Sequence, residues 1–154
     1  MNSLFVLVAE AACRAVVVQA AQAVDSGNFH DFAALFLPDG MLVRPDGSTL
    51  LGRDAIVSAY QARDPDRLTQ HLVCNQQVEV NEVAGTASAR CKVLLWSGRH
   101  SAAQTPKGRL ADAMVQVGEM VDELSLTPDG WRIRSRNAKF VLYSDQENSR
   151  RIGF

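Results

Sequence analysis

The sequence lacks the residue patterns that bind metals, bind nucleotides or build a disulfide framework. Its three cysteines, Cys13, Cys74 and Cys91, are odd in number and show no CxxC spacing, which favours a reducing compartment. The three histidines are scattered, so that no two lie at ligand spacing on one element. No phosphate-binding loop, serine nucleophile elbow or nicotinamide-binding glycine motif is present. We therefore expect neither a metal ion nor a cofactor.

Strong charge and long apolar runs are also missing. The formal charge of −1 over 154 residues gives no electrostatic reason to expect nucleic acid or an anionic membrane as a partner. Residues 4–9 are apolar and Ala21-Gln22-Ala23 resembles a signal-cleavage site, but no basic residue precedes the run and Glu10 and Arg14 interrupt it. No uninterrupted apolar run reaches the ~20 residues that a membrane span needs. We expect a cytoplasmic protein, and we interpret the late arginines (132, 134, 136, 150 and 151) as a solvated strand face and a basic tail.

The residue pattern in the first part of the chain predicts three helices. From Ser3 to about Val24 the residues are nearly all apolar, with one narrow polar stripe, which is typical of a helix covered on most sides. Ser26-Gly27 ends this helix, and Asn28 then precedes a second, short one. A short strand is predicted at 41–43, and a third helix runs from about Arg53 to Gln61.

The second part predicts a sheet. Residues 70–81, 86–97, 114–127 and 131–143 are rich in β-branched and apolar side chains and are separated by turn signals. The segment 98–112 between two of these strands, which contains Pro106 and Gly108, is predicted to be a long hairpin connection. We expect one α+β domain over residues 1–154, with its core at about 9–143 and a tail at 144–154. In it, three N-terminal helices pack into a strongly curved antiparallel sheet around an apolar pocket.

Five short strings, in this order, resemble the SnoaL-like branch of the nuclear transport factor 2-like superfamily: residues 25–29 (DSGNF), 35–40 (LFLPDG), 52–56 (GRDAI), 69–75 (TQHLVCN) and 129–133 (DGWRI). The resemblance implies a cone-shaped α+β barrel that forms a dimer or trimer through its sheet. The superfamily includes scytalone dehydratase, ketosteroid isomerase, polyketide cyclases, a bile-acid dehydratase and the non-catalytic β subunits of ring-hydroxylating dioxygenases. Fold alone does not choose among these activities.

His71 and Asp25 are the expected catalytic residues. The resemblance to scytalone dehydratase includes Thr69-Gln70-His71, and the strand histidine of that family points into the cavity and performs acid–base chemistry. An imidazole suits this role because its ordinary pKa is close to neutrality. Asp25 matches the family's inward-facing aspartate and would orient the ring. The alternative interpretation is a structural core histidine beside an aspartate that merely ends a helix.

The remaining expected site residues would contact the ligand. Strand parity places His71, Val73 and Asn75 on one face, so that Asn75 could hydrogen-bond a carbonyl group. Either Asp122 or Glu123 could face inward, because the two alternate along one strand. Arg44 could bind a carboxylate or lie solvated at an edge. The expected ligand contacts are Asn75, Trp96, Val73, Phe29, Met120 and Asp122.

The departures from the family pattern limit what can be transferred. The second histidine of scytalone dehydratase is matched here by Trp96, and its tyrosine before the aspartate by Val24. The base aspartate of ketosteroid isomerase, which precedes a proline, is matched by Arg44. An isomerase of that type is therefore disfavoured.

Three functions stay open. The first is a cofactor-independent lyase, isomerase or cyclase that acts on a small apolar, aromatic or polycyclic molecule. The second is a non-catalytic β-type subunit that assembles with the α subunit of a ring-hydroxylating oxygenase. The third is a ligand-binding protein without turnover. A homodimer is expected, because one sheet face and the apolar N-terminus both need cover.

Overall fold

The computed structural model describes residues 3–149 and contains four helices and six strands within them. In chain order these are α1 (Leu4–Asp25), α2 (Phe29–Ala34), β1 (Phe36–Val43), β2 (Thr49–Leu51), α3 (Arg53–Gln61), β3 (Arg67–Asn81), β4 (Thr86–Arg99), β5 (Ala111–Thr127), β6 (Gly130–Asp145) and α4 (Gln146–Ser149). The first and third predicted N-terminal helices are confirmed to within one or two residues. The second was expected to continue to Pro38 but ends at Ala34, and the short strand predicted at 41–43 already begins at Phe36. Each of the four predicted long strands is longer than expected, because hairpin pairing extends past the apolar core of each strand.

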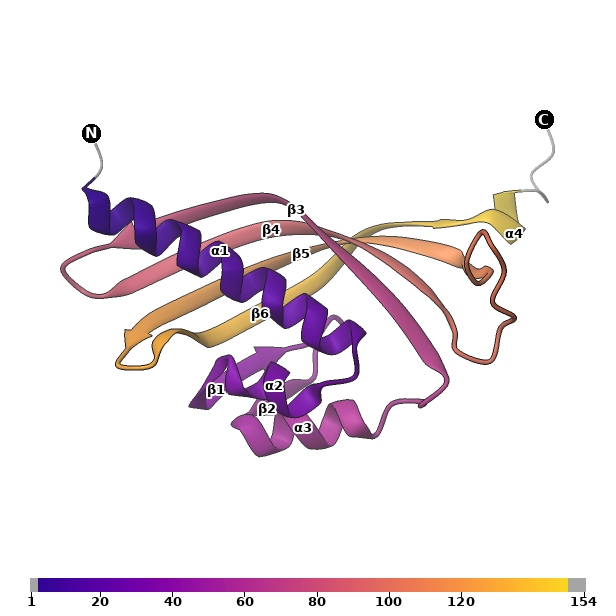
Figure 1. The fold of residues 1–154 in the computed structure, drawn as a ribbon, viewed down its shortest axis with the longest axis horizontal. Coiled ribbons are helices and arrows are strands. Elements are labelled where there is room, and N and C mark those ends of the chain that lie inside the picture. The colour runs from indigo at the N-terminus through magenta and orange to yellow at the C-terminus, as the bar shows by residue number, and fades with distance from the viewer. Residues whose placement is uncertain (1–2, 150–154) are drawn as a thin grey trace.

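Helix α1 lies diagonally across the sheet (Figure 1) and supplies much of its cover. The hydroxyl of Ser3 accepts a hydrogen bond from the backbone N–H of Val6 at 3.1 Å, which caps the first turn. Gly27, at φ 73°, follows the last turn in the left-handed region that glycine tolerates. The buried face of α1 includes Cys13, Val17 and Ala20, and α1 contacts β3 more extensively than any other strand.

By length and composition α1 could also cross a membrane, since its apolar window has a mean hydropathy of 1.8. Membrane spans, signal sequences and core helices of soluble proteins share this composition. In the structure, α1 packs one face on the sheet and buries a third of that window.

The six strands form one sheet in the order β2-β1-β6-β5-β4-β3. The sheet twists strongly along its length, and β2 and β3 are its edges, so it does not close into a barrel (Figure 1). The expectation of a purely antiparallel sheet is wrong at one place, because β1 runs parallel to β6. The predicted α+β class, in which helices pack against a curved sheet, is confirmed.

An aromatic cluster on α2, β1 and α3 lies at one end of the space between the helices and the inner face of the sheet. The ring of Phe32 lies 5.3 Å from the ring of Phe36 and 4.8 Å from that of Tyr60, measured between centroids. All three side chains are buried. This cluster packs α2 and α3 against each other and against β1.

Several bulges interrupt the sheet, and two of them change which residues near the site face the helices. In β3, Cys74 pairs with Lys92 and Gln77 with Arg90, so that two residues oppose one. In β6, Glu123 pairs with Ser135 and Leu124 with Ile133, so that Arg134 is the extra residue. After each bulge the inward parity shifts by one position.

The second bulge places Arg136 in the core, where its guanidinium binds the Asp122 carboxylate through two hydrogen bonds of 2.7 Å. Arg136 is 5% exposed and Asp122 is 1% exposed. Burial alone would lower the pKa of Arg136, but Asp122 outweighs it and raises that pKa. The interpretation of the late arginines as a solvated face is therefore wrong for Arg136.

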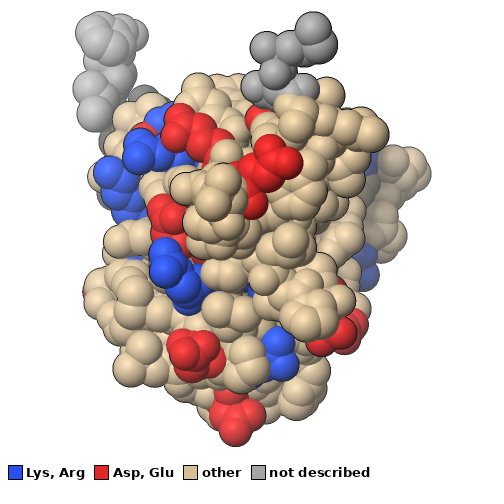
Figure 2. All heavy atoms as spheres, turned by 90° about the vertical axis from the view of Figure 1, so that its left-hand side faces the viewer, with Lys and Arg blue, Asp and Glu red and all other residues tan. Residues whose placement is uncertain are grey.

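At the end of the molecule seen in Figure 2, acidic and basic side chains are interspersed among uncharged ones. The predicted tail at 144–154 is, as far as Ser149, the end of β6 and the short helix α4. Residues 150–154, with Arg150 and Arg151, and the expected domain limits at 1 and 154 lie outside the described residues.

We predict that Asp122→Asn lowers the free energy of unfolding by about 3–5 kcal/mol, because it leaves the buried Arg136 charge without its counter-ion. Asp64→Asn is the matched control. Its ion pair with Arg99 is more than half exposed, so that the loss should stay below about 1 kcal/mol. Urea unfolding of both variants checks this. Equal losses would contradict the role assigned to the buried pair.

Candidate active site

Asp25 and His71 meet where the end of α1 lies against β3. Oδ1 of Asp25 lies 2.5 Å from Nδ1 of His71 and accepts a hydrogen bond from the Thr69 hydroxyl at 2.9 Å. Oδ2 of Asp25 accepts from the backbone N–H of His71 at 2.8 Å. The carboxylate is thus bound to two consecutive inward positions of β3, and both side chains of the Asp25–His71 pair are mostly buried.

These hydrogen bonds determine the ionisation of Asp25. Burial alone would raise the pKa of the carboxyl, but the hydrogen bonds and charge interaction with His71, together with the Thr69 hydroxyl, hold it below its ordinary value. An ionised carboxylate only accepts, so the 2.5 Å contact requires a proton on Nδ1. In the neutral ring the lone pair is then on Nε2, which no residue in the described part of the chain hydrogen-bonds.

His71 lines a cavity of about 250 Å³ between α1, the aromatic cluster and the inner face of the sheet. Most of the cavity wall is apolar: it includes Ala20 and Val24 of α1, Phe32, Leu42, Leu95 and Met120. Asp25 lies outside this lining, behind the ring of His71. The ring of His71 is thus part of the wall of an apolar space, its Nδ1 is held by the carboxylate, and its Nε2 has no hydrogen-bond partner within residues 3–149.

The structure places four of the expected ligand contacts on the inner side of the sheet, but only one in the cavity wall. Met120 lines the cavity. Val73 packs against the core, and Phe29 packs on Tyr60 at 5.7 Å in an adjacent hollow that also contains Asp25. Asp122 faces inward, whereas Glu123 lies on the other face, and Asp122 reaches the cavity only through Arg136.

Two of the expected contacts, Asn75 and Trp96, lie away from the cavity. Asn75 lies in the bulge of β3 at φ 52° and is exposed, because the extra residue turns it away from the face of His71. Trp96 is 39% exposed, since its neighbour Leu95 takes the inward position on β4. The side chain that was matched to the second histidine of scytalone dehydratase therefore lies on the outer face of the sheet.

Sequence reasoning missed the cationic part of the cavity. Arg136 lines it from β6, Arg63 from the segment that joins α3 to β3, and Arg67 from the first position of β3. Arg44, expected either to bind a carboxylate or to lie solvated, lines it as well. The one available signal was the spacing of Arg63 and Arg67 around Asp64-Pro65-Asp66, a loop directly before the strand that carries His71.

Neither the buried cysteine thiols nor any group of potential metal-ligating side chains within residues 3–149 contributes to this site. Burial raises the pKa of Cys13 and of Cys91 to about 11, against the weaker opposing effects of Arg14 and Arg136, respectively. Both thiols are therefore neutral at physiological pH. Within residues 3–149, no three His, Cys, Asp or Glu side chains are grouped so that they could hold a metal ion.

Known proteins resemble this chain in family and in fold. A family model described as SnoaL-like domain matches residues 6–137. No curated protein matches the chain significantly. Many solved structures share the fold. Some of them are described as nuclear transport factor 2-like.

Three of these structures are informative. A candidate scytalone dehydratase from Novosphingobium aromaticivorans is 18% identical with a TM-score of 0.75, covering 90% of this chain and 88% of its own. A hexachlorocyclohexane dehydrochlorinase, LinA type 2, is 13% identical with a TM-score of 0.74, covering 90% and 89%. A candidate aromatic ring hydroxylase from N. aromaticivorans is 18% identical with a TM-score of 0.70, covering 92% and 96%. At these identities the likeness shows the fold alone.

We predict that the stability contributed by Asp25 depends on pH. The pKa of Asp25 is lower in the folded than in the unfolded protein, so this stability is present above the unfolded pKa and is lost as the pH falls through the folded one. The difference in unfolding free energy between the wild type and Asp25→Asn should be largest near neutrality and shrink below about pH 4. Urea unfolding from pH 7 to pH 3 measures it. Ser26→Ala, which removes no carboxylate, should run parallel to the wild type, and a pH-independent difference for Asp25→Asn would refute the prediction.

Proposed function

This chain belongs to the family of SnoaL-like domains, and we propose that it is a cofactor-independent lyase that eliminates a small leaving group from an apolar ring compound. Two of the structures with the same fold are named as a dehydratase and a dehydrochlorinase, and both names describe eliminations. An elimination needs a base near a C–H bond and a site that excludes water. The cavity at His71 supplies the base, and its mostly apolar wall would displace water once a ring compound is bound.

In the proposed step, Nε2 of His71 takes a proton from a ring carbon of the substrate. The C–H electron pair forms the new double bond, and the leaving group departs with its own bonding pair. The imidazolium that results is stabilised by the Asp25 carboxylate at 2.5 Å from Nδ1. His71 then releases the proton to the leaving group or to water, so that no external oxidant, reductant or metal takes part in the balance.

The observation that carries this proposal is the division of the His71 ring between two environments. Nδ1 is held by a carboxylate of lowered pKa, while the ring contributes to the wall of an apolar cavity. Nε2 has no hydrogen-bond partner within residues 3–149, which leaves it available to a bound molecule. Isomerisation and cyclisation would use the same proton transfer, so the leaving group is the part of the proposal that the activity assay must establish.

The test is turnover of elimination substrates, a hydroxylated tetralone and a chlorinated cyclohexane, followed by product chromatography. We predict that His71→Ala lowers kcat/KM by about 10²–10⁴-fold, the usual contribution of a general base. Asp25→Asn should lower it to a lesser extent. His30→Ala is the matched control, because His30 is exposed on α2 and does not line the cavity. Undiminished turnover in His71→Ala would end the proposal, and binding without turnover would favour the ligand-binding alternative.

A second part of the proposal is a homodimer formed through the outer face of the sheet. Leu72, Leu94, Val117 and Leu142 are cross-strand partners and form an apolar row over β3, β4, β5 and β6. Leu72 is 49% and Leu142 67% exposed, and Trp96 lies beside the row. Such a continuous apolar row is unusual on the surface of a monomer. A heteromeric partner, the oxygenase α subunit, would use the same surface, and the hydroxylase-like neighbour is the reason to consider it.

Size-exclusion chromatography with light scattering tests the dimer. We predict a dimer for the wild type and a monomer for Leu72→Glu/Leu142→Glu, because two carboxylates in each copy would have to be desolvated at the interface. Val83→Glu is the control, since Val83 is fully exposed in the β3–β4 turn, away from the row. A wild type that elutes as a monomer would contradict the homodimer.

We also propose a cytoplasmic location, which suits three free cysteines, one of them (Cys74) exposed.

A further inference from the structure

We propose that the molecule bound in this cavity carries a carboxylate, which Arg63 and Arg67 bind while the apolar ring lies against His71. The inference rests on the proposed function in that it takes the cavity as the ligand site, and it names the substrate class as aromatic or alicyclic carboxylic acids. It begins from the charges that line the cavity.

Five cationic side chains other than His71 line the cavity, and three of them have acidic partners. Arg136 is neutralised by Asp122, and Lys139 pairs with Glu119 at 3.3 Å. Arg44 reaches Asp46 at 3.9 Å, a long contact to a mostly exposed carboxylate. The other two, Arg63 and Arg67, form no ion pair with any residue between 3 and 149. Two positive charges at one cavity are therefore left without counter-ions.

Arg63 shows the cost of this arrangement most clearly. Its guanidinium lies 3.9 Å from the centre of the Tyr60 ring and is half-buried. Burial, chiefly, and the neighbouring charges of Arg67 and Arg44 lower the pKa of Arg63, and Tyr60 only partly offsets them. An arginine stays protonated under these conditions, so the repulsion persists in the free protein. An anion placed among the three guanidinium groups would relieve it.

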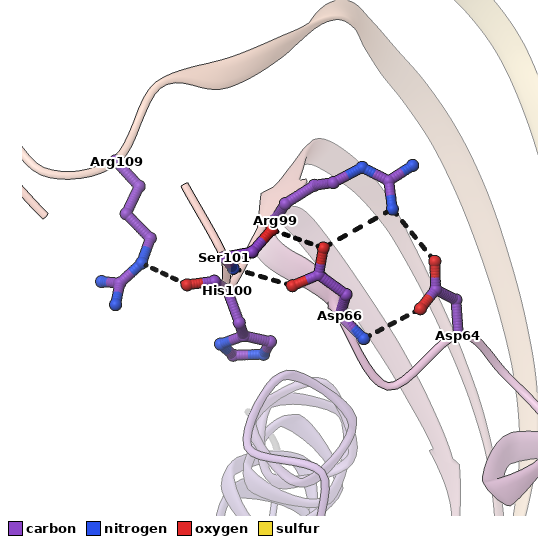
Figure 3. A network of polar contacts seen from close by, with 6 residues as sticks. All are labelled: Asp64, Asp66, Arg99, His100, Ser101 and Arg109. Atoms are coloured by element: carbon purple, nitrogen blue, oxygen red, sulfur yellow. Dashed lines mark hydrogen bonds and ion pairs between the residues drawn. The ribbon is translucent and has the colours of Figure 1, made fainter. Parts of the chain in front are cut away.

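The acidic residues closest in sequence are already engaged elsewhere. Asp64 binds the Arg99 guanidinium at 3.0 Å, and Asp66 accepts hydrogen bonds from the backbone N–H and the hydroxyl of Ser101, both at 2.7 Å. Figure 3 shows both carboxylates turned toward Arg99 and Ser101, in a network that ties this loop to the β4–β5 connection. Arg63 in this loop and Arg67 at the start of β3 thus line the cavity, while the carboxylates of the loop are directed away from them.

The shape and polarity of the site select a carboxylate on an apolar ring. A guanidinium is a planar fork that binds a carboxylate through two parallel hydrogen bonds. The rest of the wall is mostly apolar and encloses about 250 Å³, so it would bury a ring and leave the charged group at the arginines. With the carboxylate held there, the ring has one orientation relative to Nε2 of His71.

The experiment compares the binding of 2-naphthoic acid with that of 2-naphthamide, its uncharged isostere, by isothermal titration calorimetry. The wild type should bind the acid about 10- to 100-fold more tightly than the amide, as expected for hydrogen bonds to a charged group. Arg63→Gln and Arg67→Gln should each lower this preference at least about tenfold and leave amide binding nearly unchanged. Arg90→Gln is the matched control, because Arg90 is an exposed arginine of β4 outside the cavity and should leave the preference intact.

The outcomes separate this inference from the proposed function. If the wild type binds acid and amide equally, or if the preference survives in both variants, the carboxylate inference is overturned and the cavity remains a ligand site. If neither compound binds, both proposals are overturned. Arg67 is exposed, so Arg67→Gln should remain folded and can decide the question even where Arg63→Gln, which loses the contact with Tyr60, does not fold.

Discussion

The structure depends on one carboxylate that joins the end of α1 to the edge strand of the sheet. Asp25 accepts from the Thr69 hydroxyl, from the backbone of His71 and from its ring, and all three partners lie within three residues of β3. A half-buried carboxylate with fewer partners would be expensive to desolvate. The helix therefore has one favourable position along the strand, and that position defines the roof of the cavity and the tautomer of His71 together.

Periodicity in the sequence was sufficient for three helices and the four long strands, but not for β2, α4, the start of β1 or the details of the sheet. The apolar pattern of α1 and the β-rich segments predicted three helices and four long strands, because burial on one face leaves a clear period. Asn75 and Arg136 were misplaced for a common reason. Both predictions assumed that inward-facing and outward-facing side chains alternate without interruption along a strand. A single inserted residue in β3 or β6 reverses the face to which the later side chains of that strand point. Bulges of this kind depend on pairing with the neighbouring strand, which one strand's own residues do not record.

The pair Asp25 and His71 was predictable because both positions lie before any bulge and because the strings around them resemble a family with a known arrangement. The arginines at the cavity were not predictable in the same way. Arg63 lies in a short loop and Arg67 begins the strand that follows it, and the direction of this loop is set by contacts with a segment more than thirty residues further on, around Ser101. Contacts of such sequence separation leave no periodic trace in the chain.

Two arginines of this cavity show how the same side chain supports either the fold or a ligand, depending on its counter-ion. Arg136 has its carboxylate within the protein, so its charge is satisfied whether or not the cavity is occupied. Arg63 has no such partner, and its repulsion by Arg67 and Arg44 is a cost that the free protein bears. A fold retains an unbalanced charge cluster against its own stability when a bound state removes the imbalance. For this reason the unpaired arginines, rather than the paired one, indicate the chemistry of the proposed ligand.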